Sequence, residues 1–184
     1  MCQLCNSKPV YEFTNKRKLC ARCFVNYFQK KFLYTLRKFD MIKREDIIGY
    51  KKNNDFRNVV LENLLQLASQ KYGFSLVKLP NKKANKIASD SSIDFEAKSV
   101  INIIIEGKSS DLENYLPIEK EIIKPLYLFL DEEILLYAKI KKLKFNSIKE
   151  SRDKITDFLN KSNEKHPEVK RAVVNSLLKL YGKD

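Results

Sequence analysis

The order of apolar and polar residues along the chain predicts a mostly helical protein with a few short strands. The clearest pattern runs from Phe24 to Phe39, where apolar side chains recur every three or four residues, as on the buried face of an α-helix. Further helices are expected over residues 57–71, 83–90, 95–106, 130–141, 151–162 and 167–181. Short strands are expected over residues 74–79 and 122–124, and strands that a helix separates should pair in parallel.

Local signals at the ends of these segments support the predicted boundaries. Gly73 follows the helix of residues 57–71 and suits the left-handed position that closes a helix. Residues 131–133 are all acidic, which stabilises the first turn of a helix through its dipole. Ser147 or Ser151 is a candidate N-cap for the next helix, and Pro167 suits the first turn of the last one.

We predict that the chain has three parts. Residues 1–24 form a metal knuckle, residues 24–56 form a basic helix and a linker, and residues 57–184 form the main domain. The linker is the charged stretch of residues 40–56, which contains a glycine and two adjacent asparagines. A chain of 184 residues with 43% hydrophobic residues suits one domain with its own core and a short appended module.

The four cysteines form the strongest chemical motif. Cys2 and Cys5 make one CxxC pair, Cys20 and Cys23 make a second, and a hairpin-like segment joins the two. Two such turns can close a tetrahedral shell of four thiolates, which leaves no open position for a catalytic water. We predict one structural zinc ion, whose binding largely drives the folding of this small module. Iron in the same shell and a dithiol redox pair are the alternatives.

The positive charge of the chain is concentrated in its first third. The net charge is +13, and residues 1–57 hold 14 Lys/Arg against 5 Asp/Glu, whereas residues 58–184 hold 22 against 18. Such a distribution favours docking of a polyanion on the N-terminal part, although a solvated helix face and a lysine-rich composition are the simpler alternatives. The candidate phosphate contacts are Lys16, Arg17, Lys18, Arg22, Lys30, Lys31, Arg37 and Lys38. Tyr27 and Phe28 could stack on bases, but we expect both to pack in the core.

The sequence offers little for catalysis. Its single histidine, His166, stands before a proline between two predicted helices, where a surface or capping role explains it. The four glycines are too far apart to build a phosphate-binding loop, and no cysteine remains outside the knuckle to act as a nucleophile. No apolar run reaches the roughly 18 residues that span a bilayer. We therefore expect a cytoplasmic protein that is not an enzyme by itself and binds no nucleotide.

Four stretches, taken in order, resemble a known family. They are the run Leu19 to Phe24 leading into Tyr27 to Phe32, the run Ile123 to Ala138, the run Arg152 to Leu159, and the run Glu164 to Pro167. Together they resemble the cytoplasmic tRNA 2-thiolation proteins, enzymes with the ATP-pyrophosphatase fold of the adenine-nucleotide hydrolase superfamily. The resemblance implies a role in placing sulfur on a tRNA uridine.

The departures from this family decide which member the chain resembles. Catalytic subunits carry an SGGxDS-type pyrophosphate loop, further cysteines in the core and usually a second cysteine cluster near the C-terminus, and this sequence has none of them. The space before Arg57 also looks too short for the first strand, loop and helix of the fold. The resemblance therefore implies that residues 57–184 are a truncated, degenerate α/β domain, similar to the non-catalytic second subunit in shortened form.

The predicted function follows from this resemblance. We expect a non-catalytic subunit of a tRNA uridine 2-thiolation complex, which binds tRNA, forms a heterodimer with the catalytic thiolase subunit, or does both, and does not contact a membrane. The alternative is a zinc-ribbon regulator that acts on DNA or a polymerase. A free-standing thiolation enzyme with a degenerate site and a purely structural subunit on an acidic partner protein are further hypotheses.

Overall fold

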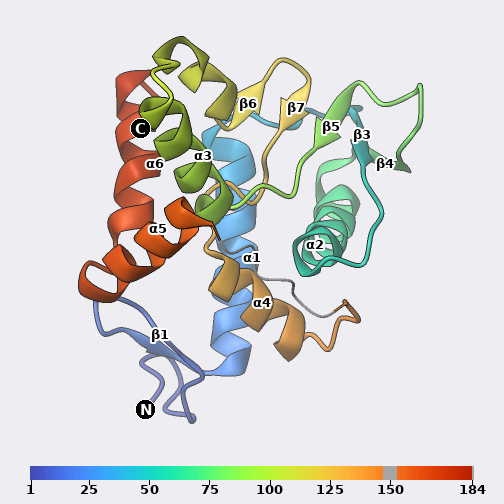
Figure 1. Cartoon of the computed structure of the whole chain (residues 1–184). Helices are drawn as coiled ribbons and strands as arrows, with labels where there is room; N and C mark the ends of the chain where they lie inside the picture. The colour runs from blue at the N-terminus through green and yellow to red at the C-terminus, as the bar shows by residue number, and fades with distance from the viewer. Residues whose placement is uncertain (147–152, 184) are drawn as a thin grey trace.

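The computed structural model describes residues 1–146 and 153–183, and it combines a small sheet with the helices packed around it (Figure 1). As predicted, the protein is mostly helical and its strands are short. Along the chain the elements are β1 (Tyr11–Glu12), β2 (Lys18–Leu19), α1 (Ala21–Lys38), β3 (Ile47–Tyr50), α2 (Phe56–Tyr72), β4 (Ser75–Lys78), β5 (Lys86–Ala88), α3 (Ile93–Ile105), the 3-10 helix η1 (Ser109–Tyr115), β6 (Ile118–Glu119), β7 (Ile122–Ile123), α4 (Asp131–Ile140), α5 (Lys154–Lys165) and α6 (Val169–Leu180).

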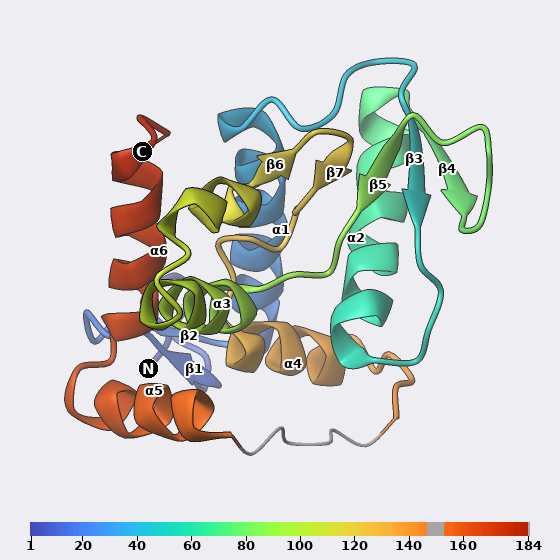
Figure 2. The same ribbon diagram turned by 45° about the horizontal axis from the view of Figure 1, so that its top comes forward.

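The main sheet has five strands in the order β4-β3-β5-β7-β6, which Figure 2 shows across its upper half. β4, β3, β5 and β7 are parallel, and β6 closes the sheet as an antiparallel edge strand. In register, Ile48 of β3 lies between Leu76 of β4 and Lys86 of β5. The helix α2 separates β3 from β4, so the expected parallel pairing of strands across a helix is confirmed.

The predicted linker of residues 40–56 is wrong in its centre, because it contains β3, an internal strand of the sheet. β3, the loop of residues 51–55 and the start of α2 also supply the strand, loop and helix for which the sequence seemed to leave no space. β3 has only four residues, too few to show a period, and its glycine looked like a loop signal. Pairing with strands distant in sequence makes this segment a strand.

The predicted helix over residues 83–90 is also wrong, since Lys86–Ala88 form β5 between β3 and β7. Ala88 is buried there, and Ile87 donates a backbone hydrogen bond to the carbonyl of Glu121 at 2.8 Å. Hydrogen bonds of this kind depend on tertiary neighbours, so the local sequence does not reveal them. The 3-10 helix η1 was not anticipated either.

Gly49 allows an unusually short crossover between parallel strands. β4 and β5 lie on opposite sides of β3, and only residues 79–85 connect them. A Cβ atom at Gly49 would stand 2.7 Å from Cδ2 of Leu79 and 2.9 Å from Cβ of Ala84. The crossover therefore passes over β3 at the one position without a side chain.

The buried apolar residues form two cores. One joins α1, α2 and α4 to buried residues of β3, β5 and β7, and the other joins α3, η1, α5 and α6. Phe28 of α1 lies at the heart of the first core, with its ring centroid 4.5 Å from those of both Phe129 and Tyr137. Core packing of Phe28 is thus confirmed. None of the described helices is long and apolar enough to cross a lipid bilayer.

The helix ends follow the predicted chemistry in most places. Gly73 closes α2 in the left-handed conformation, with φ of 71°. His166 is the exposed C-cap of α5, which confirms its capping role. Asp153 caps the N-terminus of α5 by accepting the backbone N–H of Thr156, whereas Ser147 and Ser151, the predicted caps, lie outside the described residues. Pro167 precedes α6 rather than standing in its first turn.

The crossover predicts the effect of adding one methyl group to β3. Gly49→Ala should lower the free energy of unfolding by about 1–3 kcal/mol, because Cβ of Ala84 cannot retreat without moving the backbone. Ala84→Gly in the same chain should restore part of the loss, measured by urea denaturation of both single variants and the double variant. Additive effects of the two substitutions would contradict the close approach.

Candidate metal centre and nucleic-acid interface

The two cysteine turns meet at the N-terminal end of α1, as Figure 1 shows at the bottom of the molecule. The backbone N–H of Asn6 donates to the carbonyl of Cys2 at 2.9 Å and closes the first turn. The second turn is the start of α1, where Cys20 is the N-cap residue and Cys23 lies in the first turn. The short hairpin of β1 and β2 joins the two turns. The fold thus brings together the side chains of four cysteines that lie between residues 2 and 23 of the sequence.

The sulfur atoms of Cys2, Cys5, Cys20 and Cys23 all lie within 4.8 Å of one another. The Sγ atom of Cys5 stands 3.4 Å from that of Cys20 and 3.6 Å from that of Cys23. Cys2 and Cys20 are buried, whereas Cys5 is exposed. Four convergent sulfurs with this spacing can hold a metal ion, and no other side chain is needed to complete a tetrahedral shell.

The electrostatic interactions among the cysteine thiols favour the binding of a cation. Hydrogen bonds from the side chain and backbone of Ser7 lower the pKa of Cys5 to about 6, which favours its thiolate form. The neighbouring Cys5 sulfur, together with burial, raises the pKa of Cys23 to about 12. The first thiolate thus opposes ionisation of the next. A bound metal cation removes this conflict because it stabilises all the thiolates together.

The predicted phosphate contacts in the hairpin are partly neutralised by an acidic neighbour. The amine of Lys18 lies 2.9 Å from a carboxylate oxygen of Glu12, and that of Lys16 lies 3.9 Å from the other oxygen. Arg17 makes no such pair within the described residues. Its guanidinium lies over the rings of Phe13 and Tyr27, at 5.0 and 5.2 Å from their centroids.

Four of the predicted contacts on α1 point to solvent. Arg22, Lys30, Arg37 and Lys38 are exposed, and none of them pairs with a carboxylate in the part of the chain that the structure describes. Arg37 donates from Nε to the carbonyl of Leu33 at 3.3 Å, one turn earlier in the helix. Their charges are therefore available to an anionic partner along most of the helix length.

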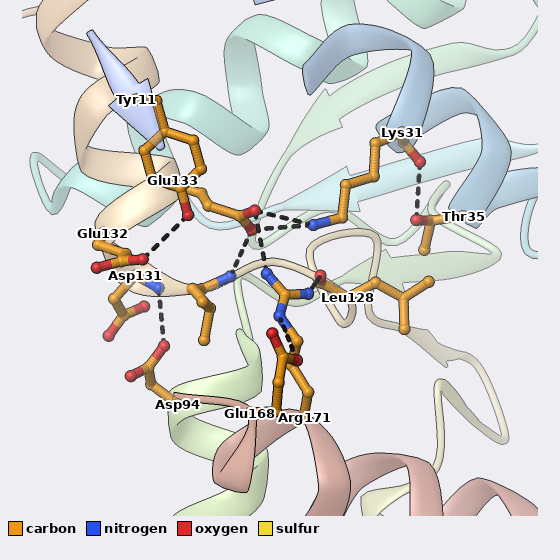
Figure 3. A network of polar contacts seen from close by, with 11 residues as sticks. Tyr11, Lys31, Thr35, Asp94, Leu128, Asp131, Glu132, Glu133, Glu168 and Arg171 are labelled. Carbon is orange, nitrogen blue, oxygen red and sulfur yellow. Dashed lines mark hydrogen bonds and ion pairs between the residues drawn. The ribbon is translucent and has the colours of Figure 1, made fainter. Parts of the chain in front are cut away.

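Lys31 has a different environment from the other predicted contacts (Figure 3). Its amine lies 2.9 and 3.3 Å from the two carboxylate oxygens of Glu133, a side chain of α4 that is fully buried. Nη2 of Arg171 on α6 donates to the same carboxylate at 3.1 Å, and the backbone N–H of Leu130 donates to it at 3.0 Å. Burial lowers the pKa of Lys31 to about 8, although Glu133 opposes this shift. We call Lys31, Glu133 and Arg171 the carboxylate clamp.

A pocket of about 510 Å³ opens between the metal module and α1. Its walls combine cations and aromatic rings without any acidic residue. The lining residues are Leu4, Arg17, Cys23, Asn26, Tyr27, Lys30, Lys31 and Tyr34. From the sequence, the three cations and Cys23 were candidate site residues and Tyr27 a possible stacking residue, whereas Tyr34 was not a candidate. The signal was the spacing of Tyr27, Lys30, Lys31 and Tyr34, which places them on one face of a helix.

At the carboxyl end of β3, where parallel sheets commonly bind ligands, the protein uses its own side chains as caps. The loop of residues 51–55 has no glycine, and the carboxylate of Asp55 accepts the backbone N–H of Arg57 at 2.9 Å. Arg57 in turn makes a two-pronged ion pair with Asp131 at the start of α4, with Nε 2.7 Å from Oδ1. The N-terminal end of α2 is therefore closed by a carboxylate and an ion pair.

The same edge is tied together at the starts of α3 and α4. Asp94 accepts the backbone N–H of Asp131 at 2.8 Å and pairs with the amine of Lys170 at 2.6 Å. Asp90, after β5, accepts a hydrogen bond from the side chain of Asn58 on α2. The acidic residues 131–133 do occupy the first turn of α4, as predicted, but all three also make tertiary contacts that sequence alone did not reveal.

Loss of one cysteine ligand should release the module while the rest of the chain keeps its fold. Cys20→Ser should remove the bound metal, counted by elemental analysis, and should speed amide exchange in residues 1–20 and the first turn of α1. Exchange in α5 and α6 should not change, because these helices belong to the other core. Chelation of the metal from the native protein should give the same exchange pattern. An unchanged pattern in either experiment would contradict a structural metal.

The carboxylate clamp predicts a large cost for losing one charge. Glu133→Gln keeps the shape but leaves Lys31 and Arg171 facing each other inside the protein, so the free energy of unfolding should fall by about 3–5 kcal/mol. The pKa of Lys31 should fall further, since Glu133 now raises it. Denaturant titration and side-chain NMR measure the two effects. Glu113→Gln, at an exposed position of η1, is the matched control, and an equal effect there would contradict the clamp.

Comparisons with known proteins support the fold. No protein-family model matches the chain, and no curated protein matches it. Among solved structures, it is similar to the U34-tRNA thiolase NcsA from Methanococcus maripaludis with its 4Fe–4S cluster, with a TM-score of 0.79 and 17% sequence identity. The match covers 97% of this chain and 86% of that one. The chain thus has the pyrophosphatase-like fold of a tRNA thiolase, with a four-cysteine cluster at its N-terminus, as predicted.

Proposed function

We propose that this protein is a non-catalytic, RNA-binding partner of a catalytic tRNA thiolase and acts in the cytoplasm. The observation that carries the proposal is the closed carboxyl edge of the sheet in a fold similar to that of a tRNA thiolase. A thiolase of this fold needs a site for a nucleotide, whereas this chain fills the corresponding edge with its own side chains.

The loop of residues 51–55 argues against binding of a pyrophosphate group. Phosphate loops use glycines so that several backbone N–H groups can approach the phosphate oxygens at the start of a helix. Here the sequence of the loop is Lys-Lys-Asn-Asn-Asp, and the carboxylate of Asp55 already accepts an N–H group of the first turn of α2. A phosphate at this position would lose that donor and would face a negative charge. This arrangement supports a role without ATP hydrolysis.

The basic residues support contact with RNA. Arg22, Lys30, Arg37 and Lys38 are exposed side chains of α1 and have no carboxylate partner in the described chain, so each can neutralise a phosphate. Arg17 adds a fifth cation at the start of the same surface. Contacts of this kind give affinity and salt dependence rather than a choice of sequence. In the proposed complex, the catalytic partner supplies the chemistry and this surface helps to hold the tRNA.

The spacing of the cysteine sulfurs supports a single zinc ion as the bound metal. Zn–S bonds of about 2.3 Å in a tetrahedron place the sulfurs about 3.8 Å apart. The Cys5–Cys20 and Cys5–Cys23 sulfur separations of 3.4 and 3.6 Å are close to this value, and all four sulfurs lie within 4.8 Å of one another. A 4Fe–4S cluster, which the structural neighbour carries, binds each cysteine to a different iron and spreads the sulfurs further apart. The zinc would brace the start of α1 and supply no chemistry.

Purification from native cells and direct RNA binding test the proposal together. The tagged protein should recover a pyrophosphatase-fold thiolase with tRNA, and the purified protein should bind tRNA with log K falling linearly as log salt rises. Recovery of a lone monomer that binds no tRNA would refute the proposal. Tighter binding to duplex DNA than to tRNA, without any thiolase, would favour the zinc-ribbon regulator instead.

A further inference from the structure

The pocket beside the metal module has the features of a nucleotide subsite. One wall is Leu4 and Cys23, which belong to the cysteine turns, and the opposite wall is the exposed face of α1. Its volume of about 510 Å³ lies within the range of small-molecule sites. Because the module and the helix share this pocket, its shape depends on the angle at which the module meets α1.

Tyr34 is the aromatic side chain that the pocket leaves most open. Half of its surface, 51%, is exposed, and no hydrogen bond to it occurs within the described residues. Tyr27, seven residues or about two helix turns earlier on the same face, is more enclosed, since Phe13 packs edge-on against its ring at 4.9 Å and Arg17 covers it. An open ring at the rim of a basic pocket provides a stacking surface for a nucleic-acid base.

The cations of the pocket have different roles. Lys31 forms an ion pair with the buried carboxylate of Glu133, so its charge is already neutralised. Lys30 and Arg17 have no carboxylate partner within the described residues, and Nε of Arg17 is shielded from water without any acceptor. Both side chains line the pocket, so an anion bound there would meet two cations that no carboxylate of the described residues neutralises. These two side chains are therefore the anion-binding groups of the pocket.

We propose that this pocket holds one unstacked nucleotide of a bound RNA, with the base on Tyr34 and the phosphate between Arg17 and Lys30. The inference rests on the proposed RNA-binding function and names the place where a single-stranded segment docks. An anion fits a pocket lined by three cations and no acidic residue, and a flat aromatic group fits the exposed ring of Tyr34. Stacking of this kind accepts any base, so the site should show little sequence preference.

Fluorescence anisotropy with a labelled oligouridylate, repeated at several salt concentrations, tests the inference. Tyr34→Ala should weaken binding about 5- to 100-fold without changing the salt dependence, because it removes stacking and no charge. Tyr34→Phe should restore affinity to within about twofold, since the ring is kept. Lys30→Ala should lower the slope of log K against log salt by about 1, as expected for one lost phosphate contact.

Two matched variants control for general effects. Tyr72→Ala removes a similarly exposed tyrosine at the end of α2, and Lys179→Ala removes an exposed lysine of the last turn of α6, at the opposite end of the molecule from the module (Figure 1). Tyr72→Ala should change oligouridylate affinity less than Tyr34→Ala does, and Lys179→Ala should change it less than Lys30→Ala does. Circular dichroism of each variant verifies that the fold is kept, and the exposed Lys30 position keeps the test valid if Tyr34→Ala unfolds.

The outcomes separate the two proposals. If the native protein binds neither tRNA nor oligouridylate, the proposed function fails. If the native protein binds both, and Tyr34→Ala and Lys30→Ala behave like their controls, the function stands and the nucleotide subsite is refuted. Loss of a protein partner in these variants without any loss of RNA affinity would also refute it, in favour of an acidic protein surface as the occupant.

Discussion

The buried carboxylate of Glu133 ties the first helix to α4 and α6, and the proposed RNA-binding surface depends on the orientation of that helix. A carboxylate that is fully buried is tolerated only where cations and hydrogen-bond donors surround it. Lys31 from α1, Arg171 from α6 and the backbone N–H of Leu130 meet this requirement from three directions (Figure 3). The clamp holds Lys31 toward the protein interior. With α1 in this orientation, the unpaired cations of the same helix face solvent. The metal module, which begins the same helix, inherits its position from this arrangement.

Polar side chains also link the starts of the helices at the carboxyl edge of the sheet. In a parallel sheet the carboxyl ends of the strands meet helix N-termini, and this edge commonly binds phosphates. Here Asp55, Arg57 and Asp131 satisfy one another across the starts of α2 and α4, and Asp94 links α3 to α4. The contacts that stabilise the edge also occupy the groups that a nucleotide would need. If the proposed function holds, the contacts that stabilise this edge are also the ones that prevent nucleotide binding.

The sequence predicted features that depend on local chemistry. The spacing of the cysteines indicated a shared site, the apolar period located α1 and α2, and Gly73 marked the end of α2. The sequence did not predict the elements whose structure depends on pairing with distant strands. β3 and β5 have four and three residues, too short for a period, and only their neighbours in the sheet make them strands. Glu133 looked like a residue that stabilises a helix start, and its burial between two distant cations could not be inferred from its position.

Calorimetric titration of the purified, metal-loaded protein with ATP and Mg²⁺ tests the central claim most directly. The same preparation should first be shown to bind tRNA, so that an inactive sample is recognised. The account predicts no binding heat for ATP, with or without tRNA, because the carboxyl edge of the sheet is closed by Asp55 and the ion pair of Arg57 with Asp131. Saturable binding with a Kd in the micromolar range would contradict it and would indicate an enzyme with an altered nucleotide site.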